Sequence, residues 1–308
     1  MNTEKQKELE MLREVTGDPT LEIVELDDTF DFKCQQCGQC CINRGDIIIN
    51  PYDVYIGAKY LGITCVDFLQ KYAVADYGGK SRIPMALLAS DKKTGFCPLL
   101  KFDANDGGKF KCTVHGAKPG ACRNHPIGIV TGMKCGENGA DQSTAQMTFI
   151  KVSQCSNSQG HNNPQLVRDW VKTSLEHQEE VEHAHLLQSY VEKHFPARLF
   201  DVVMSIMGMQ LPEDAPENLK EVNGQIKELK KVFYDLYLHY VYENFDTDRP
   251  FIEQVKENME ALDTMLEQPK LLLRHLCNEM PEGIKDAIKE LTGDENIFAW
   301  AEKEDNHD

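Results

Sequence analysis

The sequence predicts a mainly α-helical chain, in which an irregular, metal-organised N-terminal region with short helices and little strand packs with a helical C-terminal half. Two observations predict this fold class. Seven of the eleven cysteines form two groups within the 89 residues from Cys34 to Cys122. Beyond Pro164 the composition changes to long helical patterns rich in Glu, Lys, Leu and Gln. We therefore expect two domains, a cysteine-cluster domain over residues 1–160 and a helical domain over residues 161–308.

The first elements along the chain are short. Residues 3–14 predict a helix, and residues 21–26 predict a strand because of their apolar, β-branched pattern. Asn50 and Pro51 supply an N-cap and a first-turn proline for a helix that runs to about residue 60. Gly62 is the expected end of this helix.

Long helices are not expected over residues 73–160, where Gly, Pro, Lys, Asp and Asn surround short apolar pieces. A region of this length with little regular structure is difficult to hold by burial alone, which favours metal coordination as the organising interaction. The second half predicts four helices, over residues 164–195, 199–209, 215–245 and 250–280.

The formal net charge of −17 is unevenly distributed, with +7 from Lys33 to Lys134 and −24 in the remainder. The negative total argues against nucleic acid or an anionic membrane as a partner. No apolar run follows Met1, and no window approaches the ~20 apolar residues that a membrane span requires. We expect a cytoplasmic protein with reduced cysteines and an unidentified protein or redox partner. The basic stretch either stabilises a negatively charged thiolate centre or faces solvent or the acidic second half.

The first cysteine group reads Cys-Gln-Gln-Cys-Gly-Gln-Cys-Cys and comprises Cys34, Cys37, Cys40 and Cys41. Two-residue gaps allow a turn to direct two thiolates at one metal ion or cluster. Adjacent cysteines point in different directions, so Cys40 and Cys41 either serve different sites or only one of them binds the metal. A disulfide framework is disfavoured because the chain is long, has no secretion signal and has an odd number of cysteines.

Three familiar templates are incomplete in this sequence. A bacterial ferredoxin run requires a further cysteine followed by proline after Cys40, but position 44 is Arg44. A radical enzyme of the adenosylmethionine type requires a three-residue gap and then a two-residue gap, and a zinc ribbon requires a second two-residue pair further along. The sequence therefore predicts a compact cysteine cluster that distant ligands complete.

The second group follows as Gly95-Phe96-Cys97-Pro98-Leu99-Leu100 and then Cys112-Thr113-Val114-His115-Gly116-Ala117-Lys118-Pro119-Gly120-Ala121-Cys122-Arg123-Asn124-His125-Pro126. In their order and spacing, the two groups resemble the YkgJ-type cysteine-cluster family, a zinc- or iron-chelating domain distantly related to flagellin lysine N-methylase. The resemblance covers residues 32–160, about 40% of the chain.

The resemblance implies metal-ligand roles for eight cysteines: Cys34, Cys37, Cys40, Cys41, Cys97, Cys112, Cys122 and Cys155. Arg123 also matches the family's motif, which implies a cofactor-binding role in which the guanidinium donates to cluster sulfurs or binds an anion. A structural ion pair is the alternative for this arginine. The family tends to have aromatic residues where His115 and His125 stand, so metal contact by either histidine, or by Cys135, stays open.

The function expected from these residues is metal binding, with iron in an iron–sulfur cluster of the 4Fe–4S type as the cofactor. Four or more thiolates favour iron and sulfide over a hard cation. The role would be redox or, by analogy with the methylases, related to methyl transfer, and whether the chain is an enzyme stays open. The alternative is a zinc-stabilised protein-interaction module whose acidic helical half binds a partner. A nucleophilic Cys112 or Cys122 is disfavoured because clustered cysteines compete as ligands.

Overall fold

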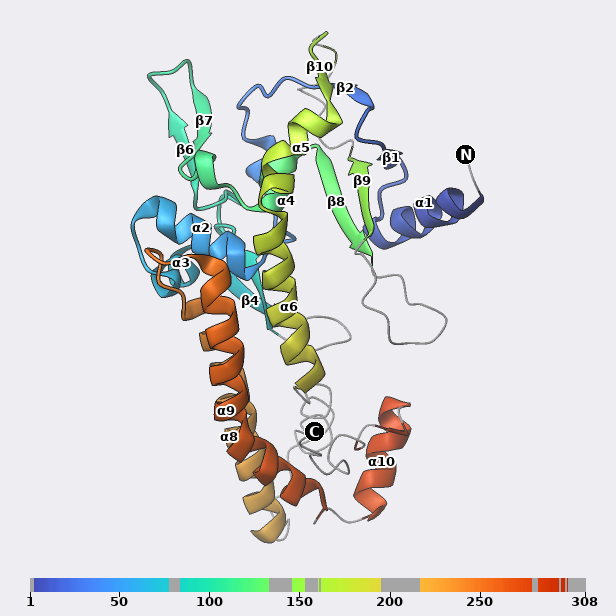
Figure 1. Cartoon of the computed structure of the whole chain (residues 1–308), viewed down its shortest axis with the longest axis vertical. Helices are drawn as coiled ribbons and strands as arrows, with labels where there is room; N and C mark the ends of the chain where they lie inside the picture. The colour runs from blue at the N-terminus through green and yellow to red at the C-terminus, as the bar shows by residue number, and fades with distance from the viewer. Residues whose placement is uncertain are drawn as a thin grey trace. The chain divides into compact units, whose positions relative to one another are not determined.

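A computed structural model describes residues 3–77, 84–132, 146–152, 160, 162–194, 217–278, 282–293, 295, 296 and 298 (Figure 1). Three predicted features lie outside the described residues: the ligand Cys155, the candidate Cys135 and the helix over residues 199–209. The chain divides into two compact units. The first comprises residues 1–49, 71–73 and 87–179, and the second comprises residues 50–70, 74–86 and 180–308. The domain boundary at residue 160 stays a prediction.

Short antiparallel strands organise the first unit. They form a three-stranded sheet and two two-stranded sheets: β1 (Glu22–Val24) with β9 (Gln146–Lys151) and β8 (Ile127–Gly132); β2 (Thr29–Asp31) with β10 (Pro164–Leu166); and β6 (Leu100–Asp103) with β7 (Lys109–Cys112). The helices of this unit are α1 (Thr3–Thr16), α4 (Gly120–Asn124) and α5 (Val167–Glu176), with two 3₁₀ turns, η1 (Gln39–Cys41) and η2 (His115–Ala117).

The first unit has an apolar core between its sheets and α5. Its buried members are Phe30, Phe32, Ile127, Phe149, Val167 and Val171. Trp170 packs edge-on against the rings of Phe30 and Phe32, with centroid separations of 5.6 and 5.1 Å. A second cluster joins Leu9 and Leu12 of α1 to Leu21 and Ile150. This burial holds the segment that leads directly into Cys34.

The predicted mainly α-helical fold with little strand is wrong. Among the described residues, ten strands form four small sheets, the remaining strands being β3 (Ile48–Ile49), β4 (Ala73–Tyr77) and β5 (Pro84–Leu88). The three-stranded sheet could not be predicted from local patterns, because β1 pairs with β9 more than a hundred residues later in the chain. Residues 73–160 also contribute to the apolar core, because Ile127 and Phe149 are buried in it.

The second unit is mainly helical. Its elements include α2 (Pro51–Leu61), most of α3 (Cys65–Tyr72), most of α6 (Gln178–His194), α8 (Glu217–Leu238), the π-helical turn η4 (His239–Glu243), α9 (Phe251–Asn278) and α10 (Glu282–Thr292). The described part of the chain has no helix with the combination of length and apolar character that a membrane span needs.

The predicted ends of α2, at Asn50 and Gly62, are confirmed. The side chain of Asn50 accepts a hydrogen bond from the Asp53 amide (2.8 Å), and the Asp53 carboxylate accepts one from the Asn50 amide (3.1 Å). Gly62 ends α2 with a φ of 65°. α1 also forms as predicted, and β1 lies inside the predicted strand.

The C-terminal helices agree with the prediction in part. The predicted helix over residues 164–195 is instead β10, α5 and α6, with a break at His177. The predicted helix over residues 215–245 gives way to the π-helical turn after Leu238, whereas α9 fills the last predicted range.

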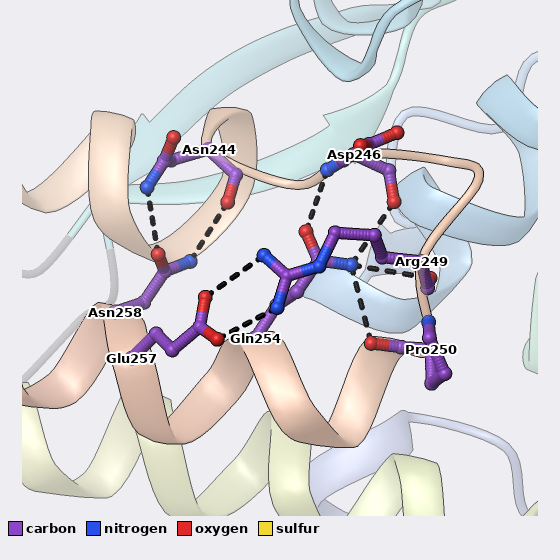
Figure 2. A network of polar contacts seen from close by, with 7 residues as sticks. All are labelled: Asn244, Asp246, Arg249, Pro250, Gln254, Glu257 and Asn258. Carbon is purple, nitrogen blue, oxygen red and sulfur yellow. Dashed lines mark hydrogen bonds and ion pairs between the residues drawn. The ribbon is translucent and has the colours of Figure 1, made fainter.

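A buried polar network fixes the loop between η4 and α9 (Figure 2). The Gln254 side chain is 3% exposed; its Oε1 accepts from the Asp246 amide at 2.7 Å. Its Nε2 donates to the carbonyls of Asp246, Arg249 and Pro250 at 3.0, 3.2 and 3.2 Å. Oδ1 of Asn258 accepts from the side-chain amide of Asn244 at 2.7 Å, and its Nδ2 donates to the Asn244 carbonyl at 3.0 Å (Figure 2). The side chains of Gln254 and Asn258 thus replace water as partners of the loop backbone, which is a structural role.

Candidate metal centre

The first cysteine group lies on a tightly turned loop. Gln36 and Gly38 both have left-handed backbone conformations, with φ of 52° and 75°. A Cβ at Gly38 would lie 3.0 Å from the Phe110 ring, so both the backbone conformation and the close approach require glycine. The chain then enters η1, where the Cys41 amide donates to the Gly38 carbonyl at 2.8 Å. This turn directs Cys40 and Cys41 towards the second cysteine group.

Backbone hydrogen bonds join this loop to the segment around Cys97. The Cys97 amide donates to the Cys41 carbonyl (2.9 Å), and the Asn43 amide donates to the Gly95 carbonyl (2.7 Å). Gly95 has a φ of 71°, and a Cβ there would lie 1.9 Å from the Asn43 side chain. Cys41 and Cys97 are therefore held on neighbouring segments although 55 residues lie between them.

The β6–β7 hairpin adds Cys112. The Leu100 amide donates to the Cys97 carbonyl at 2.9 Å, and Leu100 lies opposite Cys112 in the hairpin. The Phe110 amide donates to the Gln36 carbonyl at 2.9 Å, which ties the same hairpin to the first cysteine loop. One hairpin therefore contacts both cysteine groups.

Cys122 and Arg123 lie on α4. Cys122 is half-buried, and a negative charge on its sulfur would raise the pKa of both Cys41 and Arg44. The guanidinium of Arg123 donates to the Lys118 carbonyl at 2.8 Å. This contact gives Arg123 a local structural partner, and its cofactor-binding role stays a prediction.

Cys40 and Cys41 form an asymmetric pair. Their sulfurs lie 3.8 Å apart, a distance at which either thiol can donate to the other sulfur, and this contact lowers the pKa of Cys40 to about 6. The positive charges of Lys118 and Arg44 lower it further. The same hydrogen bond, together with burial, raises the pKa of Cys41. Cys40 is therefore the more acidic sulfur of the pair.

The other sulfurs interact with this pair through their charges. Burial is the main cause that raises the pKa of Cys97 and of Cys112, and negative charge on Cys40 raises both further. Negative charge on Cys112 also raises the pKa of Cys97, and negative charge on Cys97 raises the pKa of Cys41. Five sulfurs, those of Cys40, Cys41, Cys97, Cys112 and Cys122, therefore share one electrostatic neighbourhood.

Cys34, Cys37 and His115 are the other described residues that the sequence proposed for the centre. Cys34 is exposed and Cys37 is half-buried, both on the loop that precedes η1. His115 is exposed at η2, where the charge of Lys118 lowers its pKa. In the ranges that the structure describes, no three His, Cys, Asp or Glu side chains are already arranged to hold a metal ion.

Two cysteines outside the motifs lie in the second unit. Cys65 on α3 and Cys277 on α9 are 0% and 3% exposed, and burial raises the pKa of each to about 12. Both cysteines lie in helices. Their protonated, buried state is that of small apolar residues.

Sequence reasoning missed two cations at the centre, Arg44 and Lys118. Arg44 is held by the Asp46 carboxylate at 2.6 Å, and its backbone carbonyl accepts from the Ser90 hydroxyl at 2.8 Å. Both cations lower the pKa of Cys40. The basic character of residues 33–134 was the available signal, but summed charge along a chain gives no distances.

Thiols from four separate segments, near two cations, are the donor set of a thiolate metal-binding domain, because soft sulfur ligands suit zinc and iron–sulfur clusters. A family model agrees with this class. Residues 33–163 match the CxxCxxCC model, described as a "Putative zinc- or iron-chelating domain". The match supports the resemblance to the cysteine-cluster family and metal binding in general. No curated protein and no solved structure was found to match the chain.

Proposed function

We propose that residues 33–163 hold iron as an iron–sulfur cluster of the 4Fe–4S type. The observation that carries the proposal is that backbone hydrogen bonds and the β6–β7 pairing hold Cys41, Cys97 and Cys112 on neighbouring segments. The charges of Cys40 and Cys122 act on the same sulfurs. A 4Fe–4S cluster takes four cysteine thiolates, and the segment offers more than that number. Cys34 and Cys37, on the same loop, and Cys155, outside the described residues, are proposed as further ligands.

The charges beside the sulfurs suit an anionic centre. Several thiolates brought together repel one another, and Lys118 and Arg44 offset part of that repulsion at Cys40. When bound, a cluster of this kind supplies one-electron transfer. The chain's own residues would hold it and set its potential through the charge of nearby cations and through burial.

The biological role is proposed as electron transfer with a protein partner or, through the YkgJ-type resemblance, a reaction related to methyl transfer. Only the resemblance supports the second role. The zinc-stabilised interaction module remains the alternative, because the matched family model names both metals.

Metal analysis after anaerobic purification tests the proposal. We expect a brown protein with broad visible absorbance and with iron and acid-labile sulfide in equal amounts. Stoichiometric zinc without iron would overturn the iron–sulfur assignment and support the zinc module.

A pair of serine variants tests which thiols bind. Cys97→Ser removes a sulfur of the cluster, so this variant should lose metal, whereas Cys277→Ser, in a helix outside the matched segment, should retain it. Equal metal content in the two variants would remove Cys97 from the ligand set.

A further inference from the structure

His125 has a buried ring nitrogen for which the fold supplies no hydrogen-bond partner among the described residues. The residue follows α4 and precedes β8, three positions after Cys122. Its Nε2 is buried and has no hydrogen-bond partner within the described part of the chain. Buried polar side-chain atoms in native proteins are nearly always hydrogen-bonded or bound to an ion or water, so this nitrogen requires an occupant.

The surrounding contacts hold His125 in place. The preceding Asn124 is 4% exposed; its side-chain oxygen accepts from the Ser174 hydroxyl at 2.7 Å, and its carbonyl accepts from Trp170 Nε1 at 2.8 Å. The Phe32 ring lies edge-on to the imidazole at a centroid distance of 6.4 Å. The imidazole is thereby fixed beside the strand end that leads into Cys34.

His125 also shares its charged surroundings with the cysteine cluster. Burial, together with the charges of Arg44 and Lys118, lowers its pKa to about 4, so the ring is neutral at pH 7. The same two cations lower the pKa of Cys40, and negative charge on Cys122 raises the pKa of Arg44. Neutral imidazole is the form that binds metal ions, and a nearby cation does not prevent this when thiolates supply negative charge.

We propose that Nε2 of His125 is a ligand of the metal centre, so that the centre has mixed sulfur and nitrogen coordination. This inference rests on the proposed metal binding but not on the identity of the metal.

X-ray absorption at the K edge of the bound metal, iron or zinc, tests the inference on the full-length protein. Sulfur ligands scatter at about 2.3 Å and an imidazole nitrogen at about 2.0–2.1 Å in zinc sites. We expect a nitrogen shell in the wild type, its loss in His125→Phe, and its retention in His115→Phe, the matched variant at the exposed histidine. Chelator competition should show at least a 10-fold loss of metal affinity in His125→Phe alone.

The outcomes separate this inference from the proposed function. A wild-type protein without bound metal would refute metal binding itself. Bound metal with a sulfur-only shell, or with the same nitrogen shell in His125→Phe, would leave metal binding intact and overturn the histidine ligand. If His125→Phe does not fold, His125→Ala with added imidazole replaces it. The nitrogen shell should then depend on imidazole, and a shell that persists without imidazole would overturn the inference.

Discussion

Gly38 is the position at which the cysteine loop depends most directly on backbone geometry, and Gly38→Ala tests that dependence. An L-residue in the left-handed region, here at a φ of 75°, costs about 1–2 kcal/mol. The added methyl group would also lie 3.0–3.2 Å from three atoms of Phe110, and overpacking of this kind costs about 1–3 kcal/mol. We therefore expect the free energy of unfolding of the first unit to fall by roughly 2–5 kcal/mol.

Gly107→Ala is the matched control. Gly107 lies in the β6–β7 hairpin loop of the same unit with a φ of 63°, but a Cβ there would have nothing within 4 Å. This variant carries only the backbone cost, about 1–2 kcal/mol. Adding Phe110→Leu to Gly38→Ala should recover part of the lost stability, because the smaller side chain can move away from the new methyl group.

Urea unfolding of the metal-free, reduced protein measures these differences. Trp170 packs in the core of the first unit and is one of only two tryptophans, so a Trp300→Phe background makes it the sole tryptophan reporter. Equal losses for Gly38→Ala and Gly107→Ala would refute the claim that Phe110 closes on the loop. No loss for either variant would show that the cysteine loop and the hairpin open independently of the core.

Three further predictions concern the thiols and the polar network. In the metal-free protein, the rate of Cys40 alkylation should rise with pH through a midpoint of about 6, because only the thiolate reacts. Cys41→Ala should move this midpoint to higher pH, because it removes the hydrogen-bond partner of Cys40. Peptide mass spectrometry at each pH measures the alkylation in both proteins. Gln254→Ala should lower the free energy of unfolding by roughly 2–4 kcal/mol, since it leaves four buried hydrogen bonds unmade; thermal unfolding measures the loss. Cys37→Ser should weaken metal binding, so limited proteolysis of the metal-loaded preparation should cut residues 73–160 faster than the helices after residue 164.

Each of these predictions has a result that contradicts it. A Cys40 midpoint near the ordinary thiol value of 9.0 would mean that Cys41 and Lys118 do not act on it. Glu257→Gln, which removes only an exposed ion pair with Arg249, is the control for Gln254→Ala and should change stability much less. Equal protease resistance of both halves in Cys37→Ser would argue against metal as a stabiliser of the first unit.

Local signals were sufficient for several elements and for the chemical class of the site. Asn50, Pro51 and Gly62 determine both ends of α2, because caps act through neighbours in the chain. The spacing of the cysteines was sufficient to predict thiolate metal binding, which the family model supports. The close approach of Gly38 to Phe110 could not be predicted from the sequence, because the two residues lie on distant segments.

The sequence by itself determined which side chains are available for the centre: many thiols, few nearby carboxylates and a basic surrounding stretch. Only the tertiary structure decided which of them meet. Backbone hydrogen bonds between distant segments hold Cys41 beside Cys97. The folded chain also brings Lys118 near Cys40 and encloses His125 Nε2 without a hydrogen-bond partner among the described residues. The physical reason is that backbone pairing and charge interactions depend on distance in space, whereas composition and spacing report only distance along the chain.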